Sequence, residues 1–291
     1  MPGNATVKWC DDLVSLPEND KVVRMLAFAN AKINLGLHVT EKRADGYHNL
    51  ETVFYPVKLY DVLELTDASV TSCVLGGTAV PGNPEDNICL KAYRLLEKDF
   101  HLPAQQISLL KNIPVGAGLG GGSSDAAFLI KLLNDKFKLG ISLDRMEDYA
   151  RQLGADCAFF IQNKPVYAIG KGDEFSKINI DLSDYCLVLV KPDIHVSTGD
   201  AYAGIKPAIP SRSLKDLIHL PVKDWASHLK NDFENTVFLK YPQIERVKKQ
   251  LYASGAVYAA MSGSGSAVFA IFEQQVKLPD LEKENKVFYN V

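Results

Sequence analysis

The stretch Lys111-Asn-Ile-Pro-Val-Gly-Ala-Gly-Leu-Gly-Gly-Gly-Ser-Ser-Asp-Ala-Ala127 decides how the chain folds. Five of the seven residues 116–122 are glycine, and apolar residues at helical spacing follow from Ala126 to Phe137. We therefore predict a helix whose N-terminus carries the glycines, where free N–H groups and the helix dipole favour an anion such as phosphate. A flexible glycine-serine linker is the alternative, but a linker would not lie between a strand pattern and an amphipathic helix.

Three common phosphate-binding patterns do not fit this loop. Gly116–Gly121 matches G-x-G-x-x-G, but a dinucleotide fold needs an acidic residue at the end of a second strand about 20 residues on. Here a helical pattern follows instead, and then a second helix cap at Ser142. No lysine follows the glycines as in a Walker loop, and the H-R-D and D-F-G motifs of protein kinases are missing from the sequence.

Composition limits the classes of function. The chain has 291 residues and a formal net charge of −3, so no broad basic field exists to hold nucleic acid. No apolar run reaches the roughly 18 residues of a membrane span, and residues 1–24 are too acidic for a targeting signal. The cysteines are scattered without a C-x-x-C pair, which favours a reducing compartment without disulfides or zinc: Cys10, Cys73, Cys89, Cys157 and Cys186. We expect a cytoplasmic protein whose first 24 residues are an extension before Met25.

The first half of the chain alternates strand and helix patterns without a regular β-α-β order. We expect strands from Ile33 to Thr40 and near 51–57, 61–66, 70–75 and 106–113. We expect helices at 87–98, capped by Asp86, and at 143–153, capped by Ser142. Gly154–Ile161 is interpreted as a turn into a buried strand.

The second half repeats this mixture after a polar stretch near 176–184. The expected strands are 186–190, 256–260 and 267–272, with a further strand at the C-terminus. The expected helices are 213–219, 222–239, 242–253 and a short one near 276–284. Such a mixture predicts an α+β fold rather than a doubly wound sheet.

The glycine-rich stretch resembles the second motif of the GHMP small-molecule kinases. Their first, lysine-containing motif has a counterpart in Asn30-Ala-Lys-Ile-Asn-Leu35, and their third in Ser262-Gly-Ser-Gly-Ser-Ala-Val-Phe269. The resemblance implies an ATP-binding, ribosomal-protein-S5-like N-terminal domain over 25–180. It also implies a ferredoxin-like C-terminal domain over 181–291, with the active site in the cleft between the two.

Two further stretches resemble one branch of that family. Arg43-Ala-Asp-Gly-Tyr-His48 and Leu153-Gly-Ala-Asp156 are similar to the GHMP kinases of the non-mevalonate isoprenoid pathway. These use ATP and Mg²⁺ to phosphorylate the 2-hydroxyl of 4-diphosphocytidyl-2-C-methyl-D-erythritol. The alternatives are a GHMP kinase for mevalonate, homoserine or a sugar, and a nucleotide-binding module without catalysis. The resemblance implies a monomer or homodimer, with no nucleic acid or membrane partner.

The chain departs from that branch at two places. Asn30 stands where the branch usually has proline, and Cys157-Ala158 stands where it usually has Val-Pro. Both are neighbours of the key residues rather than those residues themselves. We therefore expect little effect of either departure on the chemistry.

Two residues are the expected catalytic groups. From the sequence alone, Asp156 is either a structural turn residue or a general base, and Lys32 is more simply a solvated lysine. The resemblance implies that Asp156 is the base and that Lys32 faces it, keeping the carboxylate ionised and polarising the acceptor hydroxyl. Asn34 lies on the same side of its strand as Lys32 and could orient either group.

The expected ATP-binding residues are those of the glycine loop: Pro114, Val115, Gly116, Ala117, Gly118, Leu119, Gly120, Gly121, Gly122, Ser123 and Ser124. The two serines bind phosphate or Mg²⁺, with Ser124 the candidate metal ligand, or they cap the helix. Asp125 caps the helix, holds metal or benefits from the helix dipole. Asp86 and Asn87 are expected near the adenine.

The expected acceptor-site residues come from three places in the chain. Tyr47 and His48 suit a cytosine, because a tyrosine ring can stack on the base while a histidine hydrogen-bonds its edge. Tyr202 is expected on the base's other face, and Gly263 and Gly265 allow the third motif to approach the substrate. Five other histidines lack metal-ligand spacing and are interpreted as structural or solvent-facing: His38, His101, His195, His219 and His228.

Overall fold

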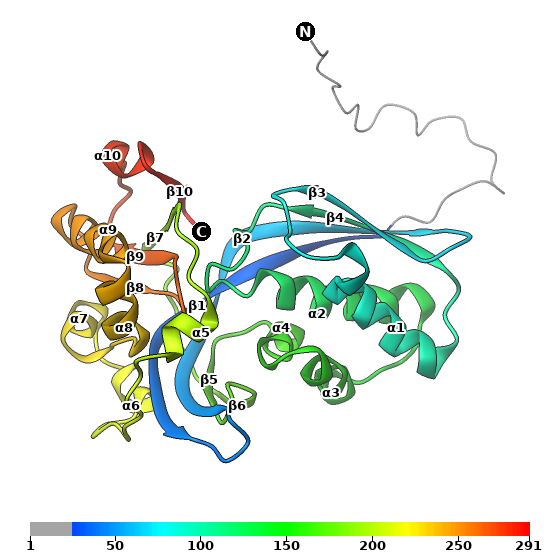
Figure 1. The fold of residues 1–291 in the computed structure, drawn as a ribbon, viewed down its shortest axis with the longest axis horizontal. Helices are drawn as coiled ribbons and strands as arrows, with labels where there is room; N and C mark the ends of the chain where they lie inside the picture. The colour runs from blue at the N-terminus through cyan, green and yellow to red at the C-terminus, as the bar shows by residue number, and fades with distance from the viewer. Residues whose placement is uncertain (1–24) are drawn as a thin grey trace, which may run out of the picture.

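The computed structural model describes residues 25–291, which form two sheets with helices around them (Figure 1). The expected N-terminal extension, residues 1–24, lies outside the described residues. The first sheet has the order β3-β4-β2-β5-β6, and β1 pairs with β2. Its strands are β1 Met25–Lys42, β2 His48–Asp67, β3 Ser72–Gly77, β4 Gln105–Lys111, β5 Val166–Ile169 and β6 Glu174–Lys177.

The two longest strands, β1 and β2, form an antiparallel pair that contacts residues of both sheets. The sequence predicts separate strands at 51–57 and 61–66, but β2 runs through both. Pro56 is tolerated because β2 is paired only with β1 at that point: β5 pairs with Thr52–Phe54 and β4 with Val62–Asp67. A register shift opposite Asn30 absorbs the two extra residues of β2, so the strand bends without ending.

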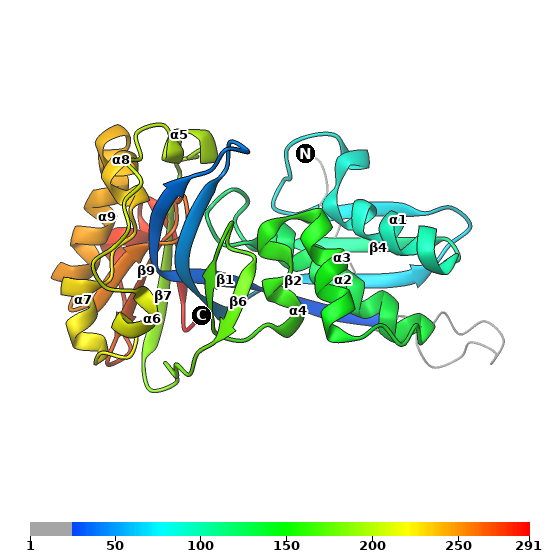
Figure 2. The ribbon, with the colours of Figure 1, turned by 90° about the horizontal axis from the view of Figure 1, so that it is seen from below.

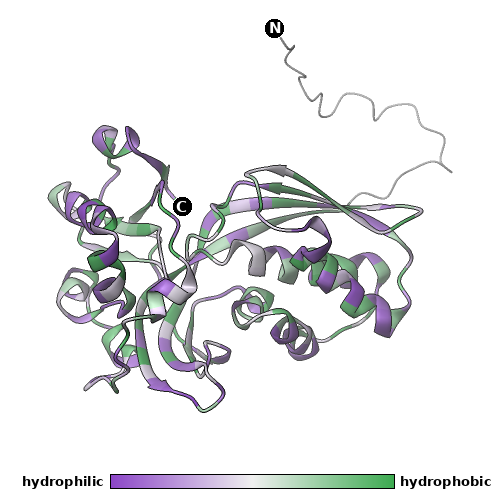
Figure 3. Ribbon diagram, in the orientation of Figure 1, coloured by the Kyte–Doolittle hydropathy of each residue, from purple (hydrophilic) through white to green (hydrophobic). Residues whose placement is uncertain are grey.

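Four helices cover one face of the first sheet (Figures 1 and 2). They are α1 Ile88–Phe100, α2 Gly121–Phe137, α3 Leu143–Leu153 and α4 Phe159–Gln162. The expected cap of α1 was one residue off, because the Asn87 side chain accepts from Cys89 N at 2.8 Å. Asp86 instead ends a short 3-10 turn. The alternation of apolar and polar residues around α1 can be followed in Figure 3.

The prediction of a buried strand after Gly154 is wrong. Ala155–Cys157 is a 3-10 turn, and Phe159–Gln162 is the short helix α4. An apolar run this short is compatible with a buried strand or a buried helix, and periodicity alone does not separate them. Here the run packs against α2 and α3, so every side of it is covered. Asp156 therefore lies in a helical turn.

The second sheet has the order β10-β7-β9-β8. Its strands are β7 Cys186–Pro192, β8 Tyr258–Met261, β9 Val268–Phe272 and β10 Asn285–Tyr289. Alternate residues of β7 enter different cores: Leu187 and Leu189 pack toward β1 and β2, while Val188 and Val190 pack toward the helices α8 and α9. Because both faces of β8 and β9 are covered in the same way, these two strands are buried along their whole length.

Of the helices expected in the second half, α9 has the predicted bounds 242–253, and the others are shorter or broken. The helices of this half are α5 Thr198–Tyr202, α6 Leu214–Leu217, α7 Trp225–His228, α8 Phe233–Lys240, α9 Pro242–Ala253 and α10 Pro279–Glu282. The single helix predicted over 222–239 is broken at Leu229–Asp232, where the backbone instead bonds to Leu37 of β1. The expected domain boundary falls between β6 and β7, and it stays a prediction. None of the helices in residues 25–291 has the length and apolar character needed to cross a bilayer.

Candidate active site

The glycine loop connects β4 to α2 and lines a cavity of about 770 Å³. Gly116, Gly118 and Gly120 have positive φ, and Gly120 occupies the N-cap of α2 without any side-chain cap. The first N–H groups of α2 are therefore free for an anion. Every predicted ATP-binding residue from Pro114 to Ser123 lines this cavity, and so do Asp86 and Asn87.

Ser124 is placed differently from its neighbours. It is fully buried, does not line the cavity, and its Oγ has no hydrogen-bond partner among the described residues. The capping alternative for both serines is wrong, since Gly120 is the N-cap and no side chain bonds to it. The role of Ser124 in binding phosphate or Mg²⁺ stays a prediction.

Asp125 forms part of a buried ion cluster below the loop. Lys111 Nζ lies 2.6 Å from Asp125 Oδ2 and also donates to Asp61, whose second oxygen accepts from Ile113 N at 2.8 Å. Burial and the neighbouring Asp61 charge raise the pKa of Asp125 to about 8 against the opposing effect of Lys111. Burial lowers the pKa of Lys111, but the two carboxylates outweigh it and the pKa is raised. Asp125 therefore anchors the start of α2 to β4, and the sequence alone does not reveal this pairing.

A second, smaller hollow of about 200 Å³ holds the two expected catalytic residues. Lys32 Nζ lies 3.4 Å from Asp156 Oδ2 and donates to Asn34 Oδ1 at 2.7 Å. Lys32 is only 4% exposed, whereas Asp156 is 35% exposed, so the pair is buried on the lysine side and open on the carboxylate side. Asn34 is held in turn by its Nδ2 donating to Thr52 Oγ1 at 2.9 Å.

The two hollows meet at the glycine loop. Gly118 and Gly120 line both of them, and Lys32 N donates to Leu119 O at 3.0 Å. A Cβ on Gly118 would lie 2.0 Å from the carbonyl oxygen of Ser262, so only glycine lets the second and third motifs touch. The three motifs thus form one surface, with the Lys32–Asp156 pair beside the larger cavity.

The third motif places its two glycines differently. Gly263 lines the small hollow, where an added Cβ would lie 3.4 Å from Asn34 Oδ1. Gly265 is not among the lining residues of either hollow, and a Cβ there would meet Met261 Sδ at 2.6 Å. The structure thus brings Gly263 to the small hollow beside Lys32 and Asp156, and it leaves Gly265 as a turn residue.

Aromatic residues from both halves of the chain close the small hollow. His48 stacks on Tyr202 with ring centroids 4.7 Å apart, and Tyr202 meets Phe233 edge-on at 4.7 Å. Burial, followed by the Asp156 charge, raises the pKa of the Tyr202 hydroxyl. Tyr47 does not join this stack: it is 63% exposed, with Lys171 Nζ 5.2 Å from its ring centroid.

Sequence reasoning missed part of the nucleotide cavity. His195 lines it, with its ring packed over Gly116, and the residue is exposed, as interpreted from the sequence, but no sequence signal assigns it to this cavity. Lys111 also contributes, from the end of β4. Lys111 opens the glycine-rich stretch itself, whereas His195 belongs to no motif and reaches the cavity through long-range packing. Over residues 25–291, no group of three or more His, Cys, Asp or Glu side chains could hold a metal ion, and the four described cysteines are free.

Comparison with known proteins agrees with this architecture. A model of the GHMP kinases N terminal domain matches residues 87–164, and one of the GHMP kinases C terminal matches residues 212–289. A 4-diphosphocytidyl-2-C-methyl-D-erythritol kinase of Bacteroides fragilis is 56% identical over 264 residues, which cover 89% of this chain and 96% of that relative.

Solved structures show the same fold. A crystal structure of 4-(cytidine 5'-diphospho)-2C-methyl-D-erythritol kinase is 30% identical, covers 91% of this chain and 98% of its own, and has a TM-score of 0.71. The homoserine kinase of Cytophaga hutchinsonii, at 15% identity and a TM-score of 0.68, covers 96% and 97% of the two chains and shares the fold alone. The α+β prediction is therefore confirmed, and the chain belongs to the GHMP family of small-molecule kinases.

Proposed function

We propose that the protein transfers the γ-phosphoryl group of ATP to the 2-hydroxyl of 4-diphosphocytidyl-2-C-methyl-D-erythritol, giving the 2-phosphate and ADP. This would place it in the non-mevalonate route to isoprenoid precursors. The proposal draws on the named activity of a relative with 56% identity. The observation that carries it is the Lys32–Asp156 pair, which lies where the acceptor hollow meets the glycine loop.

Asp156 would act as the general base in this reaction. Its exposed carboxylate faces the hollow and would accept the proton of the acceptor hydroxyl as the oxygen attacks the γ-phosphorus. A bond forms between that oxygen and phosphorus, the bond from phosphorus to the bridging oxygen breaks, and ADP leaves. Lys32, held by Asn34, would supply positive charge beside the reacting oxygens.

The glycine loop would hold the ATP phosphates through the free N–H groups at the start of α2. Mg²⁺ fits this arrangement, since it usually binds one or two protein oxygens together with phosphates and water, and needs no cluster of side chains. The unpartnered hydroxyl of Ser124 is the side chain that would hold it. When bound, Mg²⁺ would offset negative charge on the phosphates.

The aromatic end of the hollow would recognise the cytidine. Tyr202 and His48 stack on each other with an interplanar angle of 24°, and this aromatic pair would offer a surface on which a flat base stacks. Tyr47, exposed and directly before His48 in the chain, would reach the base from the β1–β2 turn. An acceptor without an aromatic base, such as mevalonate or homoserine, would leave these rings unused.

The test is ADP release with a panel of acceptors: 4-diphosphocytidyl-2-C-methyl-D-erythritol, mevalonate, homoserine and galactose. We expect turnover with the first and background rates with the others. Faster turnover of another acceptor would contradict the assigned substrate. ATP binding without turnover of any acceptor would show a nucleotide-binding module instead.

A further inference from the structure

The segment Lys230–Asp232, between α7 and α8, connects the two halves of the active site. It has no helical structure, yet Asn231 is only 2% exposed. Leu37 N donates to Lys230 O at 2.8 Å, and Asp232 N donates to Leu37 O at 2.9 Å. The segment therefore pairs with β1 five residues beyond Lys32, on the strand that carries the first motif.

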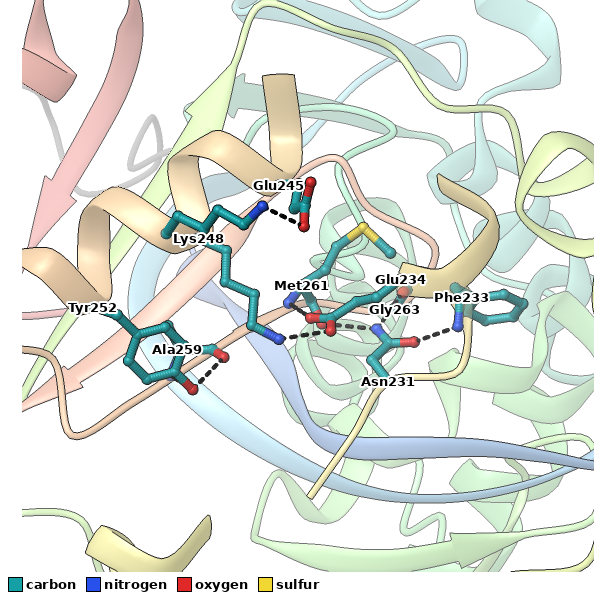
Figure 4. A network of polar contacts seen from close by, with 10 residues as sticks. Asn231, Phe233, Glu234, Glu245, Lys248, Tyr252, Ala259, Met261 and Gly263 are labelled. Carbon is teal, nitrogen blue, oxygen red and sulfur yellow. Dashed lines mark hydrogen bonds and ion pairs between the residues drawn. The ribbon is translucent and has the colours of Figure 1, made fainter. Parts of the chain in front are cut away.

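The side chain of Asn231 uses all of its polar atoms on the backbone (Figure 4). Nδ2 donates to Met261 O and to Gly263 O, each at 2.8 Å, while Oδ1 accepts from Phe233 N at 3.0 Å. A side chain of this length that donates two hydrogen bonds and accepts a third must end in an amide group. A carboxylate here would turn an oxygen toward two carbonyls.

The carbonyl that Asn231 holds belongs to the loop of the third motif. Gly263 lines the acceptor hollow and lies beside Asn34, the residue that accepts from Lys32. The same loop touches the glycine loop through Ser262 Oγ, which donates to Gly118 O at 2.8 Å. Loss of the Asn231 amide would therefore free the Gly263 carbonyl beside Asn34, while the Ser262–Gly118 bond still holds the other end of the loop; Asn231 itself lines neither hollow.

The other half of the network in Figure 4 leads away from the site. Glu234 Oε1 accepts from Met261 N at 2.8 Å, and Lys248 Nζ of α9 lies 2.6 Å from Glu234 Oε2. Lys248 thus stabilises the same strand end from the side of α9, and within residues 25–291 no hydrogen bond or ion pair joins it to the loop 262–265. It offers a matched control that perturbs the network but not the Gly263 carbonyl.

We propose that Asn231 is a positioning residue: it holds the third-motif loop against β1 and so fixes the acceptor hydroxyl relative to Lys32 and Asp156. This inference rests on the proposed kinase function. Because the reacting atoms must be placed precisely, a shift of about 1 Å in this loop can cost about a hundredfold in rate. Loss of the Asn231 donors should therefore lower kcat while the nucleotide site, built on α2, keeps its affinity for ATP.

The experiment compares Asn231→Asp and Asn231→Ser with Lys248→Met, each assayed below its own melting temperature. We expect both Asn231 variants to lose about a hundredfold in kcat, with KM for ATP within about threefold of the unchanged protein. Lys248→Met should keep kcat within about twofold of the value without substitution, even if it loses as much stability as the Asn231 variants. The serine variant guards against misfolding of the aspartate variant, since it introduces no buried charge.

Amide hydrogen exchange over residues 258–267 gives a readout independent of any acceptor. Faster exchange in Asn231→Ser but not in Lys248→Met supports the positioning role of Asn231, and equal exchange in the two variants overturns it. Unchanged kcat in Asn231→Ser, or an equal loss in Lys248→Met, also overturns the proposal. If the protein without substitutions phosphorylates no acceptor, the proposed function is refuted instead. The hydrogen-exchange data would still show whether Asn231 holds the third-motif loop.

Discussion

The nucleotide cavity and the acceptor hollow are built in opposite ways. The first is built around one continuous stretch, residues 114–123, which offers backbone N–H groups. The second takes side chains from β1, the turn before α4, α5 and the third-motif loop. A site made from local backbone tolerates changes of side chain, whereas a site assembled from distant side chains depends on each of them. This difference predicts which substitutions affect ATP binding and which affect transfer.

The largest expected effect after loss of the base comes from Lys32→Met. It keeps the buried volume but removes the charge beside Asp156 and the donor to Asn34. We expect kcat to fall about 10²–10³-fold, as on removal of one charge-stabilising donor elsewhere. Calorimetric ATP affinity should stay within about threefold. An equal loss of both would mean that the two hollows are not functionally separate.

Gly118→Ala tests the point where the hollows meet. The new Cβ would collide with Ser262 O, and φ is +78°. Gly140→Ala is the matched control, because its φ of +67° is similar but open space surrounds it. The control should lose about 1–2 kcal/mol of unfolding free energy in urea titrations, from backbone strain alone.

Gly118→Ala should destabilise more than this control, and it alone should weaken both ATP binding and turnover, by about tenfold or more. If the two variants behaved alike, the contact between the second and third motifs would have no role in the site.

Tyr202→Leu should act on the acceptor side only. The ring stacks on His48, and aromatic stacking contributes about 0.5–1.5 kcal/mol, so KM for the acceptor should rise up to about tenfold. KM for ATP should not change. Phe28→Leu, an exposed aromatic on β1, is the control for general loss of aromatic area. If KM for ATP rose and KM for the acceptor did not, Tyr202 would contribute to ATP binding, and its assignment to the acceptor hollow would be wrong.

The smallest effect concerns the support below the glycine loop. The folded protein raises the pKa of Asp125 to about 8 from its ordinary 3.8. The unfolded chain therefore ionises first, and folding stability is lost as pH rises from about 4 to about 8. Asp125→Asn removes this dependence, so its melting temperature relative to the unchanged protein should increase from pH 5 to pH 8. Asp135→Asn, at an exposed position on α2, should show no such trend.

Local features of the site could be predicted from the sequence, and long-range ones could not. The five glycines before an amphipathic helix predict the phosphate-binding loop, and in the structure residues 114–123 line one cavity. Lys32 and Asp156 are named through motifs, and they lie 3.4 Å apart. His195 and the Asp61–Lys111–Asp125 cluster reach the site by packing between distant segments, which leaves no spacing to detect.

The same distinction explains the errors in the fold. The sequence predicts two strands, 51–57 and 61–66, where the structure has the single strand β2, and only the positions of the neighbouring strands show that the missing N–H of Pro56 is not needed there. The run after Asp156 forms a helix because helices surround it. Asn30, which stands where related kinases usually have proline, forms a long-range hydrogen bond: Asn163 Nδ2, at the end of α4, donates to Asn30 Oδ1 at 2.6 Å. This bond ties the first motif to the turn that carries Asp156.

The most direct test of the account is Asp156→Asn, assayed for single-turnover phosphoryl transfer and for ATP binding by calorimetry. The amide keeps the shape of the side chain but cannot accept the hydroxyl proton as a carboxylate does. We predict that transfer slows about 10²–10⁴-fold while the ATP dissociation constant stays within about threefold. Transfer at close to the unchanged rate would contradict Asp156 as the base and, with it, the division of the site into a nucleotide cavity and an acceptor hollow.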